Sequence, residues 1–170
     1  MNHIALLLEN QPGALSRVIG LFSQRGYNID SLSVAPTQDE TLSRLTMTIG
    51  EKGADINQIL KQLYKLVDVV MVQNLSEVDS LTLELAIIKL NKAKTDIEVL
   101  LKTYEFESEI LDEKDNYTIF KVLGDTQEIE QLLSELKKEE FLEVTRSGTL
   151  GMTKGNESLA TNDQTKISYD

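Results

Sequence analysis

The 170-residue sequence has no cysteine, no tryptophan, a single histidine and only two prolines. The absence of cysteine excludes a disulfide scaffold, a thiolate zinc site, an iron–sulfur cluster and a cysteine nucleophile. The one histidine, His3, stands beside an apolar run and is predicted to be an incidental surface residue. A histidine-rich metal site cannot be built from it, and no Ser-His-Asp arrangement is expected. The sequence also has no P-loop and no G-x-G-x-x-G after a strand, so it predicts no catalytic site.

Basic residues are scarce, at 17 against 28 acidic ones, which gives a net charge of −11. Most of the acidic excess falls in residues 77–150, which carry 9 basic and 18 acidic residues. Nucleic-acid binding needs a surplus of lysine and arginine, and an anionic membrane surface repels an acidic protein. Neither is therefore expected as a partner. No stretch approaches the roughly 20 apolar residues that span a bilayer, and no leader-like segment is visible. We expect a cytoplasmic globular protein.

The first half of the sequence alternates between strand and helix patterns. Residues 3–8 are a short apolar run, and residues 9–13 have the chemistry of a turn. Apolar residues then recur at helical spacing up to Arg25, and Gly26 follows where a helix end favours a left-handed residue. The predicted strands are residues 3–8, 28–35, 44–49 and 69–75, and the predicted helices are residues 14–25 and 56–66.

The second half repeats the same order of elements. The predicted strands are residues 81–87, 107–111, 117–123 and 141–145, and the helical stripes fall at residues 97–101 and 129–136. Two βαββαβ units follow, each a ferredoxin-like α+β plait with an antiparallel sheet and two helices on one face. The predicted domains are residues 1–76 and 80–155, and residues 156–170 are expected to form a flexible tail because they hold few apolar side chains.

One loop has the chemistry of a ligand site. The sequence from Glu9 to Leu15 joins the first strand to the first helix. A helix N-terminus has unpaired N–H groups and the positive end of the helix dipole, so it attracts a carboxylate or phosphate. Gly13 would allow a ligand close to the backbone, while Asn10 and Asn28 offer amide groups. A plain turn between strand and helix, with Pro12 and Gly13 present only for geometry, is the alternative.

The run LLLENQPGALSRVIGLFSQRGYNIDSLSVAPT at residues 6–37 resembles the opening of an ACT domain, the small-molecule regulatory module of amino-acid metabolism. More narrowly, it is similar to the regulatory small subunits of acetolactate synthase. The sequences LSR at residues 42–44 and KQLYKLVDV at residues 61–69 strengthen the resemblance. The segment Arg146-Ser147-Gly148, with Gly151 and Lys154-Gly155, adds a weaker match near the end.

This resemblance implies a non-catalytic subunit that activates a separate large subunit and confers feedback inhibition by a branched-chain amino acid, usually valine. Thiamine diphosphate, Mg²⁺ and FAD are then expected on the catalytic partner and no cofactor on this chain. It also implies a homodimer in which two ACT sheets join side by side, with the effector between the protomers. The implied effector site has one side from the loop and the opposite side from the second strand of the neighbouring protomer. These residues are Asn10, Gly13, Ala14 and Leu15 on the loop side and Asn28 and Ile29 on the strand side.

Two other functions stay open. A free-standing ACT-domain amino-acid sensor could control a different protein, and an enzyme on this fold is disfavoured by the missing acid–base groups. Several further residues also allow two interpretations. Arg17 fits a solvated helix face or a functional role, Arg44 a polar strand face, and Tyr27 an interface or simple packing. The Arg146-Ser147-Gly148 segment favours a structural turn over a partner contact.

Overall fold

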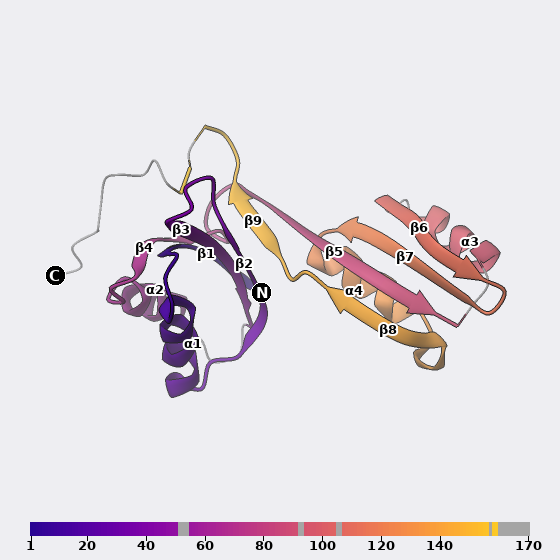
Figure 1. Cartoon of the computed structure of the whole chain (residues 1–170), viewed down its shortest axis with the longest axis horizontal. Helices are drawn as coiled ribbons and strands as arrows, with labels where there is room; N and C mark the ends of the chain where they lie inside the picture. Colours follow the sequence, from indigo (N-terminus) through magenta and orange to yellow (C-terminus); the bar gives the residue numbers. More distant parts are fainter. Residues whose placement is uncertain (51–54, 92–93, 105–106, 157, 160–170) are drawn as a thin grey trace. The chain divides into compact units, whose positions relative to one another are not determined.

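The computed structural model of the chain describes residues 1–50, 55–91, 94–104, 107–156 and 158–159 (Figure 1). It divides into two compact units. Unit 1 comprises residues Met1–Leu81 together with the segment that begins at Thr149, and unit 2 comprises Thr82–Gly148. Within the described residues, no helix is long and apolar enough to cross a membrane.

Unit 1 is a four-stranded antiparallel sheet with two helices on one face. Its strand order is β2-β3-β1-β4, so β2 and β4 are the edges. The elements are β1 (Asn2–Glu9), α1 (Ala14–Arg25), β2 (Ile29–Pro36), β3 (Leu42–Ile49), α2 (Ile56–Leu63) and β4 (Val69–Asn74). Alternate residues of β1 and β3 pack against the apolar stripes of α1 and α2, and this packing forms the core. Phe22 of α1 is fully buried there.

The opposite face of the unit 1 sheet is crossed by the segment that returns after Gly148. This segment includes the short strand β9 (Leu150–Thr153), which pairs with β5. Thr48 Oγ1 donates a hydrogen bond of 3.2 Å to Thr149 Oγ1, and both side chains are buried. Further along, Leu159 is 5% exposed in a small apolar cluster with Ala5, Leu7 and Leu75.

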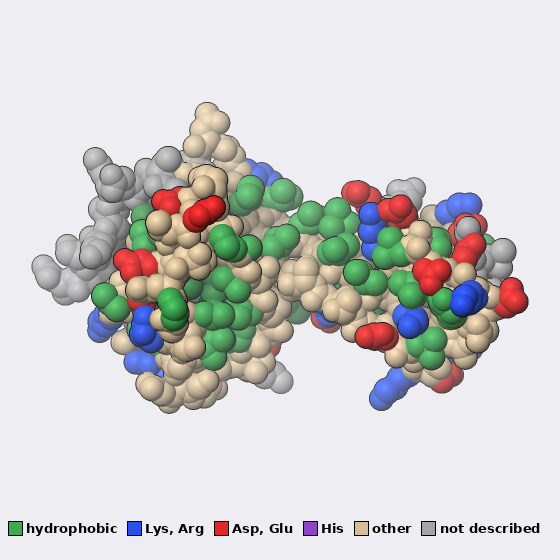
Figure 2. Space-filling model, viewed as in Figure 1, with side chains coloured by type: hydrophobic (Ala, Val, Ile, Leu, Met, Phe, Trp, Pro, Cys, Tyr) green, Lys and Arg blue, Asp and Glu red, His purple; other side chains and the backbone are tan. Residues whose placement is uncertain are grey.

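Unit 2 repeats the plan with the strand order β6-β7-β5-β8. Its elements are β5 (Ser80–Leu90), α3 (Lys94–Tyr104), β6 (Glu107–Lys114), β7 (Tyr117–Gly124), α4 (Thr126–Glu135), a 3₁₀ turn (Lys138–Glu140) and β8 (Phe141–Arg146). Phe120, Ile88 and Ile129 belong to a core separate from that of unit 1. In Figure 2, acidic and basic side chains are interspersed with hydrophobic ones over the visible face of this unit.

The predicted fold class, two ferredoxin-like βαββαβ units, is confirmed, with differences at particular segments. Strand β6 continues to Lys114, three residues beyond its predicted end at residue 111, so only Asp115 and Asn116 connect it to β7. The strand β9 was not predicted. The segment from Thr149 also packs with unit 1, whereas the predicted second domain ran to residue 155. Of the predicted flexible tail, residues 157 and 160–170 lie outside the described residues, and Leu159 is a buried core contact instead.

Candidate functional site: the N-terminus of helix α1 and its pocket

Helix α1 begins without a side-chain cap. Its N-cap residue is Gly13, with a φ of 91° in the left-handed region, and no side chain bonds to the first N–H groups of the helix. No acidic residue occupies the first turn. Helices α2 and α4, in contrast, begin at Asp55 and Asp125, whose carboxylates accept hydrogen bonds from backbone N–H groups. The start of α1 therefore keeps its positive dipole end without a side-chain cap, and the N–H of Ala14 donates to the backbone carbonyl of Gln11 at 3.2 Å.

A surface pocket of about 270 Å³ lies beside this helix start. It is formed by the end of β1, the β1–α1 loop, the first residues of α1 and the end of β2. The lining residues are Leu8, Glu9, Asn10, Gln11, Ala14, Leu15, Val34, Ala35, Pro36 and Ser43. The pocket combines aliphatic side chains with amide and hydroxyl groups, a mixture that suits a small ligand with a charged end and an apolar end.

Three of the predicted site residues, Asn10, Ala14 and Leu15, line this pocket. Asn10 is also tied to the loop between β2 and β3. Its side-chain Nδ2 donates to the carbonyl oxygen of Glu40 at 2.8 Å, and its backbone N–H donates to that of Thr41 at 2.7 Å. One amide donor of Asn10 is therefore already used within the chain, and its role includes holding two loops together.

Gly13 stands at the helix start, but the space beside it is occupied. A Cβ atom placed there would lie 3.1 Å from a terminal guanidinium nitrogen of Arg17. The positive φ favours glycine at this position, and a Cβ would also require the Arg17 guanidinium to shift by a few tenths of an ångström. Close approach of the Arg17 side chain is therefore a second reason for this glycine, beside the ligand approach predicted from the sequence.

Asn28 and Ile29 lie at the start of β2, whereas the pocket is formed by the end of that strand. Asn28 is exposed, and its Nδ2 donates to Asp30 Oδ1 at 2.6 Å. Ile29 is half-buried against the core of unit 1. These two residues do not join the pocket of their own chain, and their contribution to a neighbouring protomer stays a prediction.

Sequence reasoning missed the residue that ties the loop to the rest of unit 1. Asp68 is 1% exposed at its side chain and lies in the connection between α2 and β4. The guanidinium of Arg17 donates to both of its carboxylate oxygens through Nε and a terminal nitrogen, the latter at 2.8 Å. Gln11 Nε2 donates to the same carboxylate at 2.7 Å. Arg17 above all, and then Gln11, hold the pKa of Asp68 below its usual value.

The remaining ambiguous residues have structural roles. Arg44 donates to the carbonyl oxygen of Gly151 at 2.6 Å, and burial lowers its pKa. Tyr27 packs edge-on against Phe22, with ring centroids 6.3 Å apart, so it contributes to the core. His3 was predicted to be a surface residue but is half-buried. Its ring Nδ1 lies 3.1 Å from the hydroxyl of the buried Thr48.

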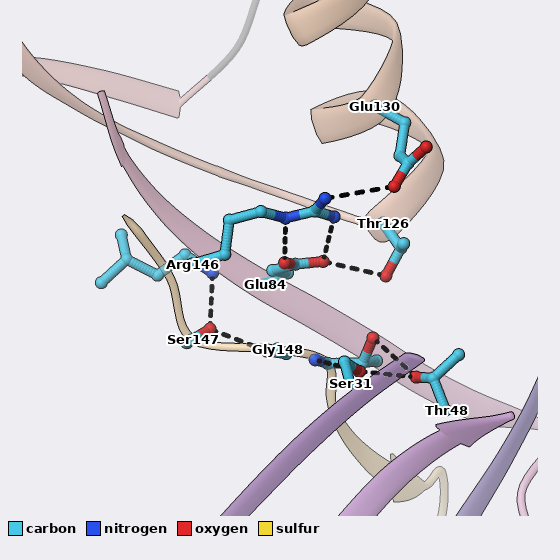
Figure 3. A network of polar contacts seen from close by, with 10 residues as sticks. Ser31, Thr48, Glu84, Thr126, Glu130, Arg146, Ser147 and Gly148 are labelled. Atoms are coloured by element: carbon cyan, nitrogen blue, oxygen red, sulfur yellow. Dashed lines mark hydrogen bonds and ion pairs between the residues drawn. The ribbon is translucent and has the colours of Figure 1, made fainter. Parts of the chain in front are cut away.

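The Arg146-Ser147-Gly148 segment, predicted as a structural turn, starts with the last residue of β8 and makes contacts within the chain. Arg146 donates to the buried Glu84, with its Nε at 2.6 Å from the carboxylate, and to Glu130 at 3.1 Å (Figure 3). Ser147 accepts a hydrogen bond from the backbone N–H of Leu85 at its hydroxyl and donates its own N–H to the Leu85 carbonyl. Among the described residues, no group of three or more acidic or histidine side chains could hold a metal ion.

Comparison with known proteins agrees with this geometry. Residues 4–71 match the model of the AHAS small subunit-like ACT domain, and residues 83–155 match that of the small subunit of acetolactate synthase. Unit 1 is thus an ACT domain, a class of small α+β modules with two helices on one face of an antiparallel sheet.

The relatives extend over nearly the whole chain. The acetolactate synthase isozyme 3 small subunit of Salmonella typhimurium is 41% identical over 159 residues, which cover 92% of this chain and 97% of that protein. The acetolactate synthase small subunit of Mycobacterium leprae is 34% identical, covering 93% and 94%. The crystal structure of the small subunit from Thermotoga maritima superposes with a TM-score of 0.78 at 30% identity, covering 92% and 98%. This chain belongs to the acetolactate synthase small-subunit family, and its partner is a catalytic large subunit.

Proposed function

We propose that this chain is the non-catalytic regulatory subunit of acetolactate synthase, that it activates the catalytic large subunit, and that it confers feedback inhibition by valine. In this proposal thiamine diphosphate, Mg²⁺ and FAD belong to the large subunit, and two copies of this chain form a homodimer. The observation that carries the proposal is the pocket beside the uncapped start of α1, within an ACT domain of this family.

The chemistry of the pocket suits a branched-chain amino acid. The positive dipole end of α1, which has no side-chain cap, favours a carboxylate. Leu8, Leu15 and Val34 offer aliphatic surface for the side chain of the effector, and Asn10 and Ser43 offer polar atoms. Threonine has nearly the shape of valine, but its hydroxyl would have to enter an aliphatic surface, so it should bind more weakly.

The position of the pocket also supports a dimer. Strand β2 is an edge of the unit 1 sheet, so one row of its backbone N–H and C=O groups is free to pair. If the β2 edges of two protomers met antiparallel, the start of one β2 would lie near the end of the other. Asn28 and Ile29 of one protomer could then face the loop of its neighbour, as the family resemblance implies.

The match of both family models along one chain favours a subunit over a free-standing amino-acid sensor. A free-standing sensor would need only the ACT domain, whereas this chain aligns with 97% and 94% of the length of the two small subunits compared above.

Calorimetric titration of the purified chain with valine, with leucine and threonine for comparison, tests the proposal. We expect saturable binding of valine near one site per protomer. Replacement of Gly13 by Asp should weaken that binding about tenfold more than replacement by Asn, because both variants share the strain of a positive φ and only Asp places a negative charge near the proposed position of the carboxylate. Equal binding by the two variants, or no valine binding even with the large subunit present, would overturn the proposed site.

A further inference from the structure

We propose that Arg17 and Asp68 are positioning residues for the effector site, and that their ion pair fixes the β1–α1 loop in the shape that binds the effector. This inference rests on the proposed function of the pocket. Neither side chain lines the pocket. In this proposal they act through Glu9 and Gln11, which line the pocket.

The Asp68 segment holds the loop at three points. Its backbone carbonyl accepts the N–H of Glu9 at 2.9 Å, its carboxylate accepts Gln11 Nε2 at 2.7 Å, and the same carboxylate accepts the guanidinium of Arg17. Gln11 Nε2 also donates to Glu9 Oε2 at 2.8 Å. Since Glu9 and Gln11 both line the pocket, the Asp68 segment is bonded to two adjacent parts of its wall.

Arg17 links the carboxylate to the start of the helix. Its guanidinium is bonded to Asp68 and lies against Gly13, at 3.1 Å from the position a Cβ would take. Its own backbone N–H donates to the Gly13 carbonyl at 3.0 Å. Arg17 thus connects the N-cap of α1 to a buried anion on another connection of the fold. Removal of the anion would weaken the contacts of Gln11 and Arg17 together, while the N–H of Glu9 keeps the backbone carbonyl of residue 68 as its acceptor.

The burial of Asp68 explains why its carboxylate needs the hydrogen bonds from Arg17 and Gln11. A carboxylate that is 1% exposed must be compensated by donors, and here Gln11 of the loop and Arg17 of α1 supply side-chain donors to it. A neutral amide in its place cannot accept from Arg17 with the same strength. The loop would then sample other conformations, and the fraction of molecules competent to bind would fall.

The test is the valine dissociation constant of the full-length chain at 25 °C, measured by calorimetry for Asp68→Asn, Arg17→Gln, Arg17→Lys and the double variant Asp68→Asn/Arg17→Gln. Arg25→Gln is the matched control, because Arg25 lies on the same helix and makes an exposed hydrogen bond to Gln62. We expect each of the first two variants to bind valine about tenfold more weakly, Arg17→Lys to fall between them and the wild type, and Arg25→Gln to bind normally.

The double variant separates a positioning role from two independent defects. If the pair acts as one unit, the double variant should bind about as weakly as either single variant, since the same interaction is already lost. Hydrogen exchange should show faster opening at residues 9–17 of Asp68→Asn, with the amides of β3 unchanged. A purely structural pair would lower the melting temperature without changing the dissociation constant of the folded chain.

The two proposals fail in different ways. If wild-type chain and Arg25→Gln bind valine and Asp68→Asn binds equally well, the positioning role is wrong while the effector site stands. Additive losses in the double variant would also overturn it. If the wild type binds no branched-chain amino acid, the proposed function itself is wrong.

Discussion

The two units share one architecture, and each buries one carboxylate against one arginine, yet the surroundings of the two pairs differ. In unit 1 the side chain of Asp68 is 1% exposed and that of Arg17 46%. In unit 2 the side chain of Glu84 is 2% exposed and that of Arg146 29%. Both pairs are charge-assisted and held by two nitrogen atoms of the guanidinium.

The difference lies in what each pair holds. Asp68 and Arg17 hold a loop whose helix starts at an uncapped glycine beside a pocket. Glu84 and Arg146 join β5 to the end of β8, and Thr126 of α4 donates to Glu84 at 3.1 Å (Figure 3). Helix α4 is closed by a capping box of Asp125 and Glu128. The same kind of ion pair thus lies beside an open pocket in unit 1 and links strand β5 to the end of β8 in unit 2.

The largest effect should come from breaking the unit 2 pair. Arg146→Ala leaves Glu84 buried without its cation, and we expect a loss of about 3 kcal/mol of folding free energy, since breaking one side of a buried pair leaves an uncompensated charge. Hydrogen exchange of the β5 and β7 amides would measure this cost for unit 2 alone. As a control, Lys121→Ala removes an exposed ion pair with Glu109 and should cost about 0.5 kcal/mol. A loss below about 1 kcal/mol for Arg146→Ala would mean that the pair is not a structural fastening.

The next effect concerns the segment after Gly148, which packs with unit 1 through Leu159. Leu159→Ala should cost about 2 kcal/mol of unit 1 stability, because it leaves a hole beside Ala5, Leu7 and Leu75. Chemical denaturation, with hydrogen exchange of the β1 amides as the readout, measures this loss of stability. Leu150→Ala, in the same segment at a side chain 50% exposed, should change stability by less than about 0.5 kcal/mol. Equal costs for the two variants would show that Leu159 is not a core residue.

The sequence pattern was sufficient for the repeated fold but not for these long-range contacts. Alternation in the strands and 3.6-residue spacing in the helices come from local burial, and they predicted both plaits. Strand β9 has four residues, too few for a pattern, and its partner β5 lies far away in the chain. Leu159 lies in a polar stretch, so its composition suggested a tail. Its burial depends on an apolar face that only the folded sheet presents.

The site was predicted in part for the same reason. A strand, a Pro-Gly turn and a helix follow one another in sequence, so the loop with Asn10, Gly13, Ala14 and Leu15 could be found locally. Asp68 was missed because 51 residues separate it from Arg17, and spacing says nothing about such a pair. A signal was present, since an aspartate inside the apolar run LVDVV at residues 66–70 is unexpected unless a cation meets it.

A smaller effect should distinguish the capped helix from the uncapped one. Asp125→Ala removes the acceptor for the Glu128 N–H, at 2.9 Å, and should cost about 1 kcal/mol of unit 2 stability. Glu135→Ala, exposed at the other end of α4, is the control and should stay within about 0.5 kcal/mol. Exchange of the first α4 amides would localise the loss. If Asp125→Ala left the stability of unit 2 unchanged, the side-chain cap would not stabilise α4, and capping would not be a difference in stability between the starts of α4 and α1.

The smallest effect is a pH dependence confined to unit 1, because the one histidine of the sequence is His3. Burial, and then the nearby N-terminal charge, lower the pKa of His3 below its ordinary value of 6.5. The unfolded chain therefore takes up a proton at a higher pH than the folded one, so the stability of unit 1 should decrease as the pH falls from about 7 to about 5. Arg17 holds the pKa of Asp68 below its usual value, so the contribution of Asp68 to stability is kept at pH 5 and is lost only at lower pH. Exchange of the β1 amides at pH 7 and pH 5 should show the decrease in the wild type and not in His3→Gln, with β5 to β7 of unit 2 unaffected. An equal decrease in His3→Gln would assign the pH dependence to carboxylates instead.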